Sequence, residues 1–124
     1  MSDSEFLDHA LDLLQEFGPV KFKKMMGGHC LFLDGLAFAI VADDTLYFKS
    51  DADNEALFAD LGLPNFTYER QGKQVSMSYR QAPEAALEDA AEMGRWAAVG
   101  HEAAVRADRK KSKRAKPKRS TGRG

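Results

Sequence analysis

Apolar residues near the start of the chain recur at intervals of three and four, at Phe6, Leu7, Ala10, Leu11, Leu14 and Phe17. This is the period of a helix that buries one face. Gly18 and Pro19 follow directly. Glycine accepts the left-handed conformation that closes many helices, and proline cannot continue the hydrogen-bond ladder. The pattern therefore predicts a helix that ends near Phe17.

The period then changes to that of strands. Residues 29–33 and 36–41 form two apolar runs separated by Asp34 and Gly35. A two-residue Asp-Gly loop favours a type I′ turn, whose twist matches that of the flanking strands. Residues 45–49 alternate between two faces and make a third strand. We expect an antiparallel meander with residues 36–41, which are apolar on both sides, at its centre.

The second half of the chain repeats both kinds of pattern. Residues 53–61 are predicted to form a short helix with Leu57, Phe58 and Leu61 as its large apolar residues. Residues 66–70 and 74–80 are predicted to form a hairpin around residues 71–73, because apolar and polar residues alternate in the second of these segments.

A last helix is predicted from Pro83 to about Val105, and Gly100 could interrupt it. The predicted fold class is therefore α+β. We expect a two-layer domain in which helices pack on an antiparallel sheet of about five strands, in the order α-β-β-β-α-β-β-α.

Charge is divided unevenly along the chain, although the net charge is only −1. Residues 1–105 carry eight basic and 18 acidic residues, a net charge of −10, whereas residues 106–124 carry ten basic residues and one acidic residue, a net charge of +9. The second segment has no large apolar residue, so nothing offsets the entropy cost of ordering it. We expect a folded domain over residues 1–105 and a disordered basic tail over residues 106–124.

A basic tail is suited to a polyanionic partner. Its side chains could neutralise the phosphates of nucleic acid without reading sequence, because no aromatic residue lies among them to stack on bases. The candidate nucleic-acid residues are Arg109, Lys110, Lys111, Lys113, Arg114, Lys116, Lys118 and Arg119. The alternative is a tail that only solubilises the protein or docks onto an acidic partner.

Residue types that carry catalysis are present but scattered. His9, His29 and His101 lie on separate predicted elements and lack the paired spacing of a metal site. Cys30 follows His29, but neighbours in a strand point to opposite faces, so the histidine could not activate the thiol. We expect no enzymatic activity, no catalytic or metal-binding residue and no cofactor.

Residues 23–28, with the sequence Lys-Lys-Met-Met-Gly-Gly, leave a small-ligand alternative open. Glycine backbones approach anions closely and lysines neutralise them. The segment runs from a helix to a strand, however, whereas a Walker-type phosphate loop runs from a strand to a helix. We therefore interpret it first as a sharp turn into the sheet.

No apolar run reaches the roughly 18–20 residues that a membrane span needs. The first residues are acidic, unlike a secretory or transit signal, and Cys30 is the one cysteine. These features favour a cytoplasmic protein that does not bind membranes.

Several short motifs occur in an order that resembles the N-terminal domain of the TfoX/Sxy competence regulators. The resemblance covers about residues 5–105. Its motifs are Met25-Met26-Gly27-Gly28-His29-Cys30-Leu31-Phe32-Leu33-Asp34-Gly35, Phe38-Ala39, Asp43-Asp44-x-Leu46-Tyr47-Phe48-Lys49-x-Asp51, Pro64-x-Phe66-x-Tyr68, Gly72-Lys73, Met77-Ser78-Tyr79, Pro83-Glu84, Leu87-Glu88-Asp89 and Trp96-Ala97.

The resemblance implies a two-layer α+β fold and a non-enzymatic role in transcription, as in regulators that act with the cyclic-AMP receptor protein to switch on DNA-uptake genes. Two-domain members carry a helical C-terminal domain, whereas here the basic tail follows, so we expect a standalone N-terminal domain. The residues that match the family signature are Gly27, Gly28, Asp34, Gly35, Asp43, Tyr47, Lys49, Tyr68, Gly72, Lys73 and Tyr79. The resemblance places the glycines and Asp34 in turns, and makes Asp43, Lys49, Tyr68 and Tyr79 candidates for a shared surface.

We therefore expect a regulatory or adaptor domain whose folded body contacts protein partners, including transcription machinery, and whose tail gives non-specific affinity for nucleic acid. The alternative is a protein-interaction module with no nucleic-acid role. An apolar edge strand or an exposed aromatic patch could also form a homodimer.

Overall fold

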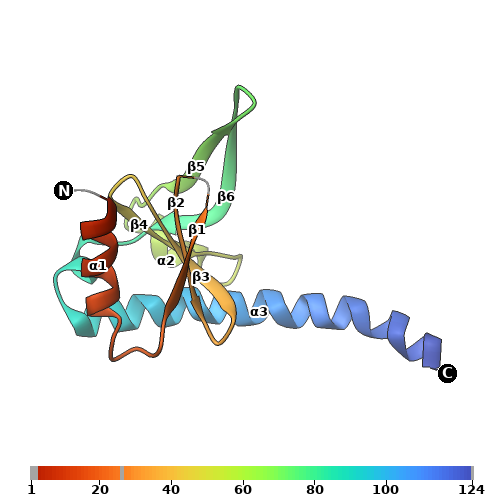
Figure 1. Ribbon diagram of the computed structural model, residues 1–124. Coiled ribbons are helices and arrows are strands. Elements are labelled where there is room, and N and C mark those ends of the chain that lie inside the picture. The colour runs from red at the N-terminus through yellow and green to blue at the C-terminus, as the bar shows by residue number, and fades with distance from the viewer. Residues whose placement is uncertain (1–2, 26, 124) are drawn as a thin grey trace.

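The computed structural model describes the backbone of residues 3–25 and 27–123, and the side chains of residues 5–25 and 27–111. Three α-helices, six strands and one 3₁₀ turn follow one another along this part of the chain (Figure 1). In chain order they are α1 (Asp3–Leu13), β1 (Lys21–Met25), β2 (Gly28–Leu33), β3 (Leu36–Ala42), β4 (Thr45–Lys49), α2 (Glu55–Ala59), β5 (Asn65–Arg70), β6 (Lys73–Gln81), the 3₁₀ turn η1 (Glu84–Leu87) and α3 (Ala90–Arg123).

The strands form one antiparallel sheet in the order β1-β2-β3-β4-β6-β5. This confirms the predicted α+β class and places β3 inside the sheet, between β2 and β4. The strand count is six and not about five, because residues 21–25 form an edge strand that was not predicted from the sequence. Lys21 pairs with Phe32 and Met25 with Gly28. The first four residues of β1 are exposed, so the segment shows no apolar face in its sequence.

Two-residue turns join three of the strand pairs. Asp34 and Gly35 have φ values of 54° and 77°, which is the positive pair that a type I′ turn requires. The predicted Asp-Gly turn is therefore confirmed. Gln71 and Gly72 adopt the same geometry, with φ values of 53° and 78°, and Lys73 belongs to the strand that follows.

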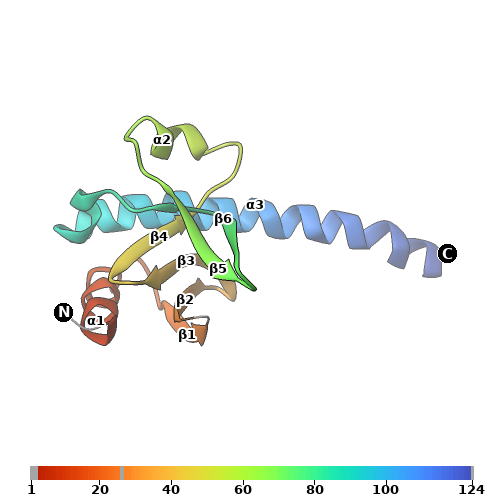
Figure 2. The same ribbon diagram turned by 90° about the horizontal axis from the view of Figure 1, so that it is seen from above.

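The main core lies between one face of the sheet and the helices α1 and α3, as Figures 1 and 2 show. The stripe predicted for the first helix is buried there, although α1 ends at Leu13 and residues 14–17 form a turn. Of the three apolar residues predicted for the short helix α2, only Phe58 is buried. Leu57 and Leu61 are 49% and 57% exposed.

The last helix starts later than the sequence analysis expected. Residues 84–87 form the 3₁₀ turn η1, and α3 begins at Ala90. The break has a local cause, because an Asp89 carboxylate oxygen accepts a hydrogen bond from the Glu92 amide (3.1 Å) and caps α3. Gly100 does not interrupt the helix.

Gly100 instead allows α3 to lie close to the sheet. A Cβ atom at this position would lie 2.9 Å from the carbonyl oxygen of Phe38 and 3.2 Å from the Cβ of Phe48. Phe38 belongs to β3 and Phe48 to β4, and both side chains are fully buried. Only glycine fits this contact without a shift of the helix or the strands.

The helix α3 crosses the predicted domain boundary at Val105. The backbone of α3 crosses this boundary without a break and continues to Arg123, beyond the sheet (Figures 1 and 2). Alanine, arginine and lysine make up most of residues 106–116 and have high helix propensity, and each of them adds a hydrogen bond to an existing helix, whereas Pro117 has no N–H to donate.

We predict that Gly100→Ala lowers the free energy of unfolding by about 1–3 kcal/mol, because the added methyl group meets the backbone of β3. Urea denaturation followed by circular dichroism measures the change. Gly94→Ala is the matched control in the same helix, since a Cβ there has nothing within 4 Å. Its gain in helix propensity makes the protein as stable as the parent or up to about 1 kcal/mol more stable. Equal stability of the two variants would contradict the close contact.

Candidate functional site

The family-signature residues fall into two groups in the structure. Six of them lie on the sheet face opposite α3 or at its margin, namely Gly27, Asp43, Tyr47, Lys49, Tyr68 and Tyr79. The others lie in hairpin turns or at strand starts, namely Asp34, Gly35, Gly72, Gly28 and Lys73. The structure thus brings together residues from β4, β5, β6 and two turns on one side of the sheet.

Aromatic rings form the centre of this face. The ring centroids of Tyr47 and Phe66 lie 4.8 Å apart, and the Phe66 ring stacks on Tyr68 at 6.0 Å. Phe66 is buried, while Tyr47 and Tyr68 are half-buried. A second, smaller core cluster therefore covers the middle of the face and leaves the edges of the two tyrosines open to solvent.

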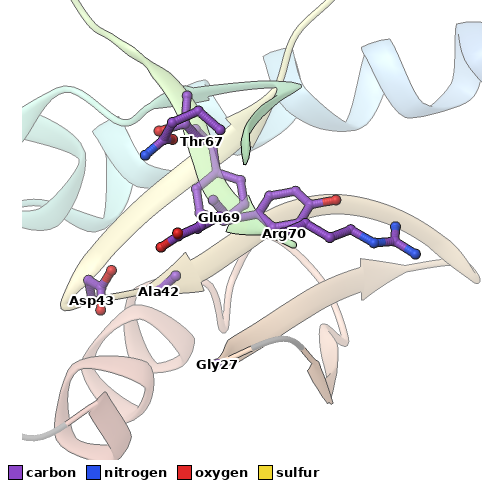
Figure 3. Close-up of a pocket in the computed structure, with 9 residues that line it drawn as sticks. Gly27, Ala42, Asp43, Thr67, Glu69 and Arg70 are labelled. Atoms are coloured by element: carbon purple, nitrogen blue, oxygen red, sulfur yellow. The ribbon is translucent and has the colours of Figure 1, made fainter. Parts of the chain in front are cut away.

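A cleft of about 910 Å³ opens beside these rings, between β5 and the turns that follow β1 and β3 (Figure 3). Its walls combine aromatic, acidic and basic residues, namely Gly27, Ala42, Asp43, Phe66, Thr67, Tyr68, Glu69, Arg70 and Gln74. β5 is the last strand of the sheet, so one of its sides has no strand partner. An apolar floor, charged walls and an open strand edge are features of sites that bind extended peptides.

Cys30 lies under the same face and is buried against Tyr79. Burial raises the pKa of the Cys30 thiol, and the positive charge of Lys49 only partly opposes this shift. Burial also raises the pKa of Tyr79, and the Lys49 ammonium lies 5.2 Å from the centre of the tyrosine ring. Both groups are therefore neutral at physiological pH, so Cys30 is held in its less nucleophilic thiol form.

The three histidines lie on α1, β2 and α3. The His9 Nε2 lies 2.9 Å from the Leu87 carbonyl oxygen, and the His101 Nε2 lies 3.3 Å from that of Leu33. Both contacts join elements that are distant in sequence. Among the residues whose side chains are described, no three His, Cys, Asp or Glu side chains gather to hold a metal ion.

The small-ligand alternative at residues 23–28 does not correspond to one loop. Lys23 belongs to β1 and Gly27 to the turn that follows, while Met26 lies outside the described residues. Lys23 and Gly27 also line different hollows. The described part of the segment is a strand and a turn and not a single phosphate cradle.

A second candidate region lies where α3 leaves the sheet. Arg106 binds Asp51 through two hydrogen bonds, from Nε to Oδ2 at 2.7 Å and from Nη2 to Oδ1 at 3.0 Å. The Asp53 carboxylate lies 3.2 Å from the same Nε. The Arg106 hydrogen bond holds the pKa of Asp51 below its usual value, and Asp51 in turn raises the pKa of the guanidinium.

The loop that holds Arg106 is itself ordered by short hydrogen bonds. Asp51 Oδ1 accepts from the Asp53 and Asn54 amides at 3.0 and 3.1 Å, which is the Asx-type turn that aspartate favours. The buried Asn54 side chain donates to the carbonyls of Lys49 and Val99, both at 3.2 Å. The loop between β4 and α2 therefore fixes α3 at two successive places.

The predicted nucleic-acid residues continue along α3 from this point. Arg109, Lys110 and Lys111 are exposed. The side chains of the remaining five candidates lie outside the described part of the chain, namely Lys113, Arg114, Lys116, Lys118 and Arg119. Sequence reasoning missed Asp51, Asn54 and Arg106 as the residues that position this helix. The Asp-x-Asp-Asn spacing was a local turn signal, but its pairing with Arg106 spans 55 residues.

These features define a small α+β domain with an aromatic cleft on its open sheet face and a basic helix that extends beyond the sheet. The chain matches the TfoX N-terminal domain over residues 12–104, about three-quarters of its length, and belongs to that family. No curated protein sequence matches it. The family match ends before Arg106, so the basic part of α3 lies outside it.

No helix in the described part of the chain is both long and apolar enough to cross a membrane.

We predict that Arg106→Gln lowers the free energy of unfolding at pH 7 by about 1–2 kcal/mol, because Asp51 loses a charged, two-fold hydrogen-bond partner. The pKa of Asp51 is lowered by folding, so this stabilisation is complete above its ordinary value of 3.8 and is lost as the pH falls below it. The difference in free energy of unfolding between the parent and Arg106→Gln therefore becomes smaller in acid.

Urea denaturation at several pH values measures this dependence. Arg95→Gln is the control, because Arg95 pairs with Glu92 at 3.4 Å on the exposed side of α3. It changes stability by at most about 0.5 kcal/mol. If Arg106→Gln lowers the free energy of unfolding by no more than this control does, the Asp51–Arg106 pair contributes nothing to stability.

We also predict that Cys30 reacts with a thiol-specific disulfide reagent on the order of 100-fold more slowly than an exposed cysteine, because the thiol is buried and its pKa is raised. The comparison is a Cys30→Ser, Ser76→Cys variant, whose thiol is on the exposed side of β6. Both proteins react alike in urea. Fast labelling of native Cys30 would contradict the buried position.

Proposed function

We propose that this protein is a non-enzymatic regulatory or adaptor domain of the competence-regulator type, acting in the cytoplasm. Its folded body contacts protein partners, including transcription machinery, and the basic part of α3 gives it non-specific affinity for nucleic acid. The family match supports a regulatory role for the body.

The observation that carries the nucleic-acid part is the fixed position of a strongly basic helix. Arg106 is occupied by Asp51 and Asp53, whereas Arg109, Lys110 and Lys111 are exposed one turn later. Residues 107–123 would span about 25 Å as a helix. Because the body is strongly acidic, a polyanion meets attraction on this extension and repulsion over most of the remaining surface.

The cleft beside β5 supports the proposed protein contact. Its aromatic floor offers apolar area, and Asp43, Glu69 and Arg70 offer charged partners on its walls. The open edge of β5 supplies backbone donors and acceptors for an extended segment.

The same cleft favours a second candidate function, a protein-interaction module with no nucleic-acid role. In that case α3 would bind an acidic protein surface or only increase solubility. The two functions differ in what the basic helix binds, so the salt dependence of nucleic-acid binding separates them.

We predict that the full chain binds duplex DNA at low salt and that the affinity falls steeply as salt is added. Replacing Arg109, Lys110, Lys111, Lys113, Arg114, Lys116, Lys118 and Arg119 by glutamine weakens binding and lowers the slope of log K against log salt by about 0.9 for each lost phosphate contact. Fluorescence anisotropy with a labelled duplex measures both quantities.

The control variant carries Arg70→Gln, Lys73→Gln and Arg95→Gln, which remove charge from exposed positions of the body. It keeps the affinity and slope of the parent. If parent and α3 variant bind equally, or if neither binds at low salt, the nucleic-acid role is wrong.

A further inference from the structure

The edge strand β1 carries a combination of residues that neither the acidic body nor the basic helix has elsewhere. Lys21, Phe22, Lys23 and Lys24 are all exposed, and Phe22 is 52% exposed despite its size. β1 is the first strand of the sheet and has a partner on one side only (Figure 2). The segment 1–105 contains eight basic residues, and three of them therefore lie beside one solvent-exposed aromatic residue in β1.

A hollow of about 590 Å³ lies along this strand and ends at the turn between β2 and β3. It is lined by Pro19, Phe32, Lys21, Phe22 and Lys23. Lys21 pairs with Phe32 and Phe22 pairs with Leu31, so Lys21 and Lys23 lie on one face of β1 and the Phe22 ring lies on the other, together with Lys24. The Phe22 ring also meets the His29 ring edge-on, with centroids 5.7 Å apart, which restricts its orientation. Asp34 is the acidic residue of the lining, on the exposed side of the turn.

A smaller hollow of about 180 Å³ lies at the other side of the same turn. Lys49 from β4 and Lys111 from α3 both line it, together with Leu36 and Asp108. The two hollows are adjacent, because Gly35 lines the first and Leu36 the second. Lys21 and Lys23 thus line the hollow on one side of the turn, and Lys49 and Lys111 line the hollow on its other side.

We propose that the open edge at β1 binds single-stranded nucleic acid, with Phe22 stacking on an unpaired base and the lysines of β1 contacting the flanking phosphates, Lys24 from the face of the ring and Lys21 and Lys23 from the opposite face. This inference rests on the proposed nucleic-acid affinity of α3 and assigns to the body the stacking that α3 lacks. Residues 106–124 contain no aromatic residue, so the extension alone attracts phosphates without distinguishing single strands from duplexes.

Single-stranded nucleic acid fits this surface better than a duplex or an acidic protein. The bases of a duplex are already stacked on one another, so an exposed ring on a strand edge cannot reach their faces. An acidic protein would use the lysines but has no need of the aromatic lining. One exposed ring with three lysines at the same open edge offers a stacking surface for a base and cations for the phosphates beside it.

The test compares the binding of a labelled oligothymidylate with that of a labelled duplex of equal length, using the full chain. Phe22→Ala weakens single-strand binding by about 5- to 100-fold, as expected for the loss of one stacked base, and leaves duplex binding unchanged. Phe22→Trp retains single-strand binding. Replacing Lys21 and Lys23 by glutamine lowers the single-strand salt slope by about 1.4, or about 0.7 for each phosphate.

Leu57→Ala is the matched control, because Leu57 is 49% exposed and lies on α2, outside both hollows. Leu57→Ala leaves the affinity for the oligothymidylate and for the duplex unchanged. The midpoints of urea denaturation establish that each variant is folded. Single-strand binding by Phe22→Ala that equals the parent's overturns the proposal. The proposal is also overturned if polyglutamate displaces the labelled oligothymidylate as strongly as unlabelled oligothymidylate does.

The failures of the two proposals are distinguishable with the α3 glutamine variant. If that variant loses binding to both ligands while Phe22→Ala binds like the parent, the β1 proposal is wrong and the role of α3 stands. If Phe22→Ala loses single-strand binding while the α3 variant keeps parental affinity and slope, the role of α3 is wrong and the β1 site stands. A parent that binds neither ligand overturns both.

Discussion

The contact of α3 with the sheet determines how the rest of the molecule is arranged. At Gly100 the helix lies so close to β3 and β4 that a single methyl group would meet the Phe38 carbonyl oxygen at 2.9 Å. Six residues later, Arg106 binds both carboxylate oxygens of Asp51. A helix fixed at these two points leaves the body in a defined direction, and Arg109, Lys110 and Lys111 therefore have a defined position relative to the sheet.

Much of the fold could be predicted from the sequence, because its signals are local. The stripe that starts at Phe6, the Asp34-Gly35 turn and the apolar run at residues 36–41 each report a period or a turn within a few residues. β1 could not be predicted in this way. An edge strand that exposes Lys21, Phe22 and Lys23 has no apolar face, and its strand conformation comes from pairing with β2.

The candidate site likewise combines features that local sequence signals predict with features that depend on long-range pairing. The basic residues after Arg106 were evident from charge alone, but their position was not, because the Asp51–Arg106 pair joins two segments 55 residues apart. The aromatic face depends on the contact of Phe66 in β5 with Tyr47 in β4, two strands that are separated by β6 in the sheet. Long-range pairing thus brings scattered aromatic residues together beside β5 and fixes the start of the basic segment of α3 against the body.

The central claim of this account is that α3 continues past Val105 as an ordered part of the body. Amide hydrogen exchange of the full chain tests it most directly, because the rate at each residue reports the local free energy of opening. The account predicts that amides 106–110 exchange slowly, within the same cooperative unit as amides 100–104. Exchange at the rate of an unstructured peptide immediately after Val105 would contradict it.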